Sequence, residues 1–139
     1  SGPYRGQKFS LFEGGIRLPA VISWTGHLPQ GVVRNQMAHG CDWLPTVAEL
    51  CQVNLPKAPI NGKSLMPIIR SANAPSPHET LHWQMGKNRW AVRNGNWKLT
   101  SENGLFLANI LDDPGEKINL SQKNPEIVNK LKTMREANK

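Results

Sequence analysis

The sequence contains few cysteines and no long apolar run. Two cysteines among 139 residues cannot form the disulfide network that stabilises many small secreted domains. Cys41 and Cys51 fall in what we expect to be one helix, about 15 Å apart along its axis and too far for a bridge. We therefore expect two buried thiols. No stretch approaches the roughly 20 apolar residues of a membrane-spanning helix, so we expect no membrane span.

Basic residues exceed acidic ones, but the sequence has no cluster of them. The formal net charge is +7, of which +4 lies in residues 1–70 and +3 in residues 71–139. A nucleic-acid-binding arm or stripe needs basic residues close together, so we expect no nucleic-acid partner. Charge spread along the chain favours a diffuse attraction to polyanions, and a sulfated polysaccharide is one such polyanion.

The first half of the sequence predicts one strand and two helices, separated by loops. Residues 19–24 form a short apolar run with β-branched residues, which favours a buried strand. Apolar residues recur at helical spacing over residues 42–52, with Asp42 as a possible cap and a proline in the first turn. Residues 65–70 predict a short helix. The polar, proline-bearing stretch at residues 71–78 predicts a linker, so we divide the chain into 1–74 and 75–139.

The second half predicts an antiparallel sheet covered by a helix. The strands are expected at residues 80–84, 89–93, 96–100 and 105–111. Asn94-Gly95 between two of these runs is a strong hairpin signal, and we expect Trp90 and Trp97 to be cross-strand partners. Residues 124–137 begin with Asn-Pro-Glu, which is typical of a helix start. The fold class expected is therefore α+β.

Residues 8–19 combine a lysine, an acid, two glycines and an arginine within twelve positions. Gly14-Gly15 indicates a sharp turn or a close approach of two backbones. Glu13 and Arg17 either form an ion pair or are separately solvated. Lys8 precedes an apolar segment, where its amine could hold an anion, although a solvated surface lysine is the ordinary alternative.

These residues resemble the sulfatase family. The resemblance begins with a lysine five residues before Glu-Gly-Gly, followed by Arg-x-Pro-Ala, an apolar run and Trp-x-Gly, in which Thr25 replaces the family's proline. Further matches follow in the expected order and cover nearly the whole chain: Asp42-Trp43-Leu44-Pro45-Thr46, Asn61-Gly62-Lys63-Ser64-Leu65, residues 91–99, and Asp113-Pro114-Gly115-Glu116 with Asn119-Leu120.

The resemblance implies the C-terminal part of an alkaline-phosphatase-like α/β fold in an enzyme that hydrolyses sulfate esters. In the family, a Cys or Ser in a Cys/Ser-x-Pro-x-Arg motif becomes the formylglycine nucleophile, and calcium polarises the sulfate. Neither Cys41 nor Cys51 begins such a motif. We expect the motif and the calcium ligands to lie upstream, so that this chain holds no cofactor and is inactive without an N-terminal portion.

Lys8 is the active-site residue that the resemblance assigns to this chain, as a contact to the sulfate. The resemblance also implies a sulfated carbohydrate as substrate and a periplasmic or secreted enzyme. His82, beside Trp83, could line a sugar subsite or could be a structural strand residue. The spacing of the four histidines predicts no metal site. The alternative function is a non-catalytic module that binds anionic glycans.

Overall fold

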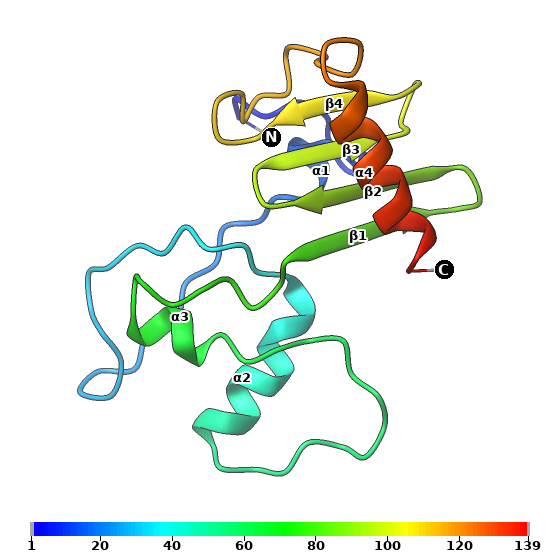
Figure 1. The fold of residues 1–139 in the computed structure, drawn as a ribbon. Helices are drawn as coiled ribbons and strands as arrows, with labels where there is room; N and C mark the ends of the chain where they lie inside the picture. Colours follow the sequence, from blue (N-terminus) through cyan, green and yellow to red (C-terminus); the bar gives the residue numbers. More distant parts are fainter. Residues whose placement is uncertain (1, 139) are drawn as a thin grey trace. The chain divides into compact units, whose positions relative to one another are not determined.

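The computed structural model describes residues 2–138, and these residues form two compact units (Figure 1). The first unit combines the residues up to Pro19 with those from Thr80 onward, and the second is Ala20–Glu79. The expected division between residues 74 and 75 concerns the domains of a longer enzyme and stays a prediction. Within the described part of the chain, no helix has the length and apolar character needed to cross a membrane.

A four-stranded antiparallel sheet forms the centre of the first unit. Its strands follow one another in chain order: β1 (Thr80–Met85), β2 (Arg89–Asn94), β3 (Trp97–Thr100) and β4 (Phe106–Asn109). The predicted α+β fold and its sheet are confirmed. The hairpin loop consists of Gly95 and Asn96, one residue later than predicted, because Asn94 pairs with Trp97. Gly95 has a φ of 56°, which suits the first position of a tight hairpin turn.

Helix α4 (Pro125–Glu136) covers one face of this sheet, as Figure 1 shows. Val92 and Leu99 are fully buried beneath it, and Leu131 of the helix is 1% exposed. Strand and helix meet here because apolar residues alternate along the strands and recur every three or four residues along the helix. The predicted C-terminal helix and its apolar face are confirmed.

The expected pairing of Trp90 with Trp97 is wrong. Trp90 lies opposite Gln84 of β1, and Trp97 lies opposite Asn94 of β2. The two tryptophans are at opposite ends of the hairpin, because residues that pair in an antiparallel hairpin are equally distant from its loop. The guanidinium of Arg135 lies 4.5 Å from the centre of a Trp90 ring instead.

The segment up to Pro19 packs on the sheet. It contacts strand side chains that alternate along the strands with those facing α4. The segment includes the short helix α1 (Glu13–Ile16), and Phe12 meets Phe106 of β4 edge to face at 5.4 Å. A Cβ atom at Gly14 would lie 2.5 Å from the carbonyl oxygen of Arg5, and one at Gly15 would overlap another backbone carbonyl. The predicted close approach is therefore confirmed, and it occurs within a helical turn.

The second unit is built from short helices and loops. These are η1 (Gly40–Asp42), α2 (Trp43–Leu50) and α3 (Met66–Arg70), so the two predicted helices are confirmed. Its buried apolar residues come from the loop ahead of η1 and from the segment of α3: Leu28, Met37, Leu65, Met66 and Ile68. Arg34 donates to the carbonyl oxygen of Ile68 at 2.7 Å and so ties an early loop to α3.

Two expectations for the first half of the chain are wrong. Residues 19–24 form no strand, and Val21 is 90% exposed. A strand needs a neighbour to satisfy its backbone groups, and none of residues 2–138 pairs with this run. Both cysteines are exposed and free: Cys41 lies in η1 and Cys51 directly after α2. Helix α2 buries Pro45 and Thr46 instead of the expected apolar face.

Candidate functional site

Lys8 lies in an exposed turn ahead of α1. Its ammonium is 5.0 Å from the centre of the Phe9 ring, and within residues 2–138 no acidic group forms an ion pair with it. Phe9 has a φ of +70° and is 68% exposed. A bulky residue rarely adopts this left-handed conformation, which costs about 1–3 kcal/mol and persists only where the surrounding structure imposes it. The backbone next to Lys8 is therefore strained.

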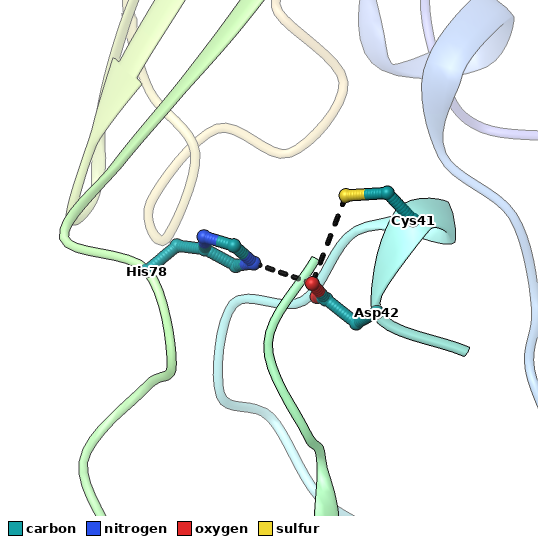
Figure 2. Close-up of side chains that lie close together, drawn as sticks. All are labelled: Cys41, Asp42 and His78. Carbon is teal, nitrogen blue, oxygen red and sulfur yellow. Dashed lines mark hydrogen bonds and ion pairs between the residues drawn. The ribbon is translucent and has the colours of Figure 1, made fainter. Parts of the chain in front are cut away.

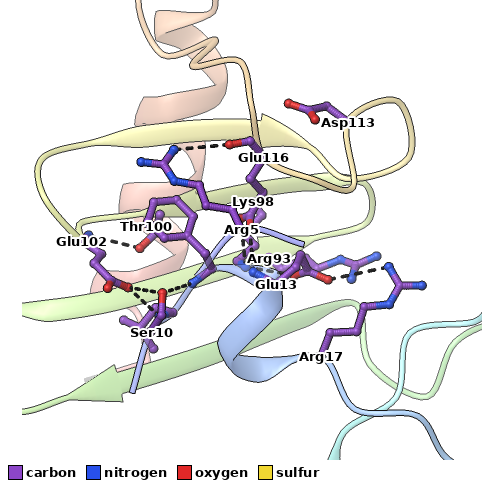
Figure 3. Close-up of polar contacts among 12 residues, drawn as sticks. Arg5, Ser10, Glu13, Arg17, Arg93, Lys98, Thr100, Glu102, Asp113 and Glu116 are labelled. Carbon is purple, nitrogen blue, oxygen red and sulfur yellow. Dashed lines mark hydrogen bonds and ion pairs between the residues drawn. The ribbon is translucent and has the colours of Figure 1, made fainter. Parts of the chain in front are cut away.

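Buried charges hold the segment that follows Lys8 against the sheet (Figure 3). The ammonium of Lys98 donates to Oε1 of Glu13 at 2.9 Å and lies 3.0 Å from Oε1 of Glu116. Oε2 of Glu116 accepts the backbone N–H of Glu13 at 2.5 Å. All three side chains are at most 4% exposed. Charges this deeply buried are tolerated because they are paired.

In the cluster of Lys98, Glu13 and Glu116, two carboxylates share one ammonium, so negative charge exceeds positive charge. Burial raises the pKa of Glu116, and the attraction of Lys98 and the N–H of Glu13 offset part of that rise. Arg17, 47% exposed, adds a second cation 3.9 Å from Glu13. Of the two alternatives for Glu13 and Arg17, the structure therefore shows the ion pair.

Glu102 ties down the backbone between Lys8 and α1. Its Oε2 accepts the Ser10 hydroxyl at 3.1 Å and the N–H of Leu11 at 2.5 Å. Arg89 donates to the carbonyl oxygen of Phe9 at 3.3 Å. The backbone directly after Lys8 is therefore fixed, while no acidic group of residues 2–138 pairs with the amine. Glu102 could not be predicted from the sequence, because it lies more than 90 positions away from its partners.

His82 occupies the middle of β1, opposite Val92. It lines a cavity of about 520 Å³ with other residues of β1, β2 and α4, among them Trp83, Lys87, Trp90, Arg135 and Asn138. Burial lowers the pKa of His82 and so favours its neutral imidazole. Within the described residues no hydrogen bond or ion pair joins Lys8 to His82. A sugar-binding role for His82 stays a prediction.

Residues 1–5, Ser-Gly-Pro-Tyr-Arg, do fit the Ser-x-Pro-x-Arg spacing, which corrects the expectation that the motif is confined to the upstream part. Arg5 has a packing role: its guanidinium lies 3.9 Å from the centre of the Phe12 ring and donates to the carbonyl oxygen of Glu116 at 3.3 Å. Ser1 lies outside the described residues. The stretch ends three residues before Lys8, whereas the resemblance places both the nucleophile motif and the calcium ligands upstream of this chain.

Comparisons with known proteins point to one family. The family described as "N-sulphoglucosamine sulphohydrolase, C-terminal" matches residues 6–138. Arylsulfatase A of Bos taurus is 31% identical over 86% of this chain and 29% of its own length. Steryl-sulfatase of Mus musculus is 37% identical over 70% of this chain and 16% of its own length.

Solved structures share the fold. The crystal structure of Ps i-CgsB matches 98% of this chain and 32% of its own with a TM-score of 0.86 and 24% identity. A structure described with the metabolism of multiple glycosaminoglycans by Bacteroides thetaiotaomicron matches the same shares at a TM-score of 0.79. This chain spans less than a third of the length of these relatives. The chain belongs to the sulfatase family, and residues 6–138 correspond to the C-terminal portion of these enzymes.

Proposed function

We propose that this chain is the C-terminal part of an enzyme that hydrolyses sulfate esters, and that Lys8 contacts the sulfate. A sulfate ester carries its charge on oxygens, and a fixed cation stabilises the charge that develops on them during hydrolysis. The upstream part would supply the formylglycine nucleophile and the calcium ion. Residues 1–5 fit the spacing of the nucleophile motif, but we assign the nucleophile and the calcium ligands to the upstream part and propose that the chain alone is inactive.

The observation that carries the proposal is the contrast between the fixed backbone beside Lys8 and its amine, which pairs with no acidic group of residues 2–138. Glu102 and Arg89 hold the neighbouring backbone, and Phe9 is kept in a strained conformation. Strain of this kind is concentrated at functional sites, where a side chain must be presented in one direction. A lysine that served solubility alone would need none of these contacts.

The proposed substrate is a sulfated carbohydrate. Two structures with the same fold carry names that refer to glycosaminoglycans and to a complex with a neocarrahexaose. These relatives share the fold at 24% identity, so they support the carbohydrate class and not a particular sugar. The net charge of +7 is compatible with a polyanionic substrate.

Substitution of Lys8 in the full enzyme tests the proposal. We expect Lys8→Ala to lower kcat by on the order of 10²–10³-fold, because one aimed donor is lost from the transition state. Lys57→Ala, which removes an exposed loop lysine, is the matched control and should retain wild-type turnover. Turnover of Lys8→Ala close to that of the wild type would refute the assignment.

The cavity beside His82 supports a second candidate, a binding site for anionic glycans without catalysis. Lys87 and Arg135 supply positive charge there, and Trp90 supplies an aromatic surface. Binding of a heparin fragment should weaken in Lys87→Ala, whereas Lys130→Ala on the exposed side of α4 should bind as the wild type does. Equal loss in both variants would indicate diffuse attraction, which salt screens.

A further inference from the structure

We propose that Cys41, Asp42 and His78 bind a zinc ion in the second unit. The proposal is independent of the sulfatase reaction, because none of these residues is assigned a part in it. The spacing of the histidines predicted no metal site, but spacing cannot show that the fold brings His78 to a residue 36 positions earlier.

The three side chains converge on one point (Figure 2). Their ligand atoms all lie within 4.8 Å of one another. Nε2 of His78 is 2.6 Å from Oδ1 of Asp42, and Sγ of Cys41 is 3.7 Å from the same oxygen. Ligands of a tetrahedral zinc are about 3.3–3.8 Å apart, given metal–ligand distances of about 2.0–2.3 Å. His78 and Asp42 would therefore have to separate by less than about 1 Å, and Cys41 and His78, which are within 4.8 Å of each other, would have to approach by up to about 1 Å.

The carboxylate of Asp42 is already positioned as a ligand. It is fully buried, and it accepts the N–H groups of Lys63 at 2.9 Å and His39 at 2.7 Å. Outer hydrogen bonds of this kind orient the ligands of metal sites. Burial on its own raises the pKa of Asp42, but these hydrogen bonds and His78 outweigh it and lower the pKa, which keeps the group ionised.

Close packing fixes the neighbouring backbone as well. A Cβ atom at Gly62 would overlap the carbonyl oxygen of Cys41, so the loop before Lys63 lies directly against η1. The hydroxyl of Thr46 accepts the N–H of Leu65 at 2.8 Å and extends the same contact into α2. The backbone that carries Cys41 and Asp42 is therefore held in place by the loop before Lys63 and by α2.

Cys41 provides the entry path for the ion. Its side chain is exposed, whereas His78 is 9% exposed and Asp42 is buried. On binding, the Cys41 thiol would lose its proton to solvent and form the sulfur–zinc bond, and the imidazole would bind through Nε2 in its neutral form. One thiolate, one carboxylate and one imidazole suit zinc, and water can fill the fourth position on the exposed side.

Titration of the metal-free chain with Zn²⁺ and Co²⁺ tests the proposal. We expect about one ion per chain, and with Co²⁺ a sulfur-to-metal charge-transfer band that shows coordination by a thiolate. Cys41→Ser should abolish the band and weaken Zn²⁺ binding by more than about tenfold, since losing a ligand costs at least as much as losing an outer-shell partner. Cys51→Ser removes the other exposed thiol and should bind as the wild type does.

His78→Gln gives a second measure, with circular dichroism to verify its fold. Zinc should raise the Tm of the wild type and of Cys51→Ser, because an ion bound to the folded state stabilises it. It should raise the Tm of Cys41→Ser and His78→Gln much less. The proposal is overturned by the absence of a band in the wild type. It is also overturned if the two cysteine variants behave alike, or if a folded His78→Gln variant binds zinc with wild-type affinity.

Discussion

Lys98 is the cation on which two buried carboxylates of the first unit depend. Replacing it with methionine keeps a similar side-chain length but leaves Glu13 and Glu116 buried without their shared partner. Removing one member of a buried ion pair costs about 3–5 kcal/mol. We expect Lys98→Met to lower the free energy of unfolding by that amount, as measured by urea unfolding followed through tryptophan fluorescence.

The matched control is Lys130→Met, because Lys130 is an exposed residue of α4. Surface substitutions of this kind usually change stability by no more than about 0.5 kcal/mol. Equal urea midpoints for Lys98→Met and Lys130→Met would contradict the buried-pair account.

Glu116 should make the stability of the first unit depend on pH. Burial raises its pKa in the folded state above the ordinary value of 4.5, so the folded state binds the proton more tightly than the unfolded state. The resulting stability is fully present below pH 4.5 and is lost as the pH rises through the folded-state pKa. Glu116→Gln cannot titrate and lacks this contribution.

The measurement is the difference in free energy of unfolding between the wild type and Glu116→Gln, from below pH 4.5 upward through the folded-state pKa of Glu116. We expect the wild type to lose stability relative to the variant as the pH rises. A relative gain with rising pH would mean that Lys98 dominates over burial and that the folded-state pKa is lowered.

Helix α4 stabilises the first unit by covering the apolar face of the sheet. Leu131 is 1% exposed within this core, whereas Leu111 is 71% exposed. We expect Leu131→Ala to cost about 2–5 kcal/mol, because it removes buried methyl groups and leaves a cavity. Chemical denaturation of Leu131→Ala and of Leu111→Ala gives the comparison, and the account fails if the two lose stability equally.

Elements with local signals could be predicted from the sequence, and elements that need a distant partner could not. The start of α4 follows from Pro125 at the first helical position, and the hairpin follows from Gly95, because such residues act over a few positions. The Asn124 side chain makes no capping hydrogen bond. The strand expected at residues 19–24 depends on a neighbouring strand, and none of residues 2–138 provides one. The register of the sheet, which separates Trp90 from Trp97, was likewise not evident from composition.

The two units differ in how much of their candidate sites the sequence revealed. Lys8 stands in a recognisable family motif, so its proposed role could be inferred before the fold was known. Its supporting residues could not, because Lys98 contacts a residue 85 positions earlier. In the second unit, Cys41 and Asp42 are adjacent, but His78 joins them through the fold alone. Chemistry that depends on tertiary proximity leaves no periodic signal in a sequence.

The central claim is that this chain holds one part of a sulfatase active site and needs another part to act. Release of 4-nitrophenol from its sulfate ester by the purified chain, with calcium present, tests that claim most directly. The account predicts no turnover above the uncatalysed rate, because the expected nucleophile and calcium ligands belong to the upstream part. Measurable turnover by the chain alone would contradict it.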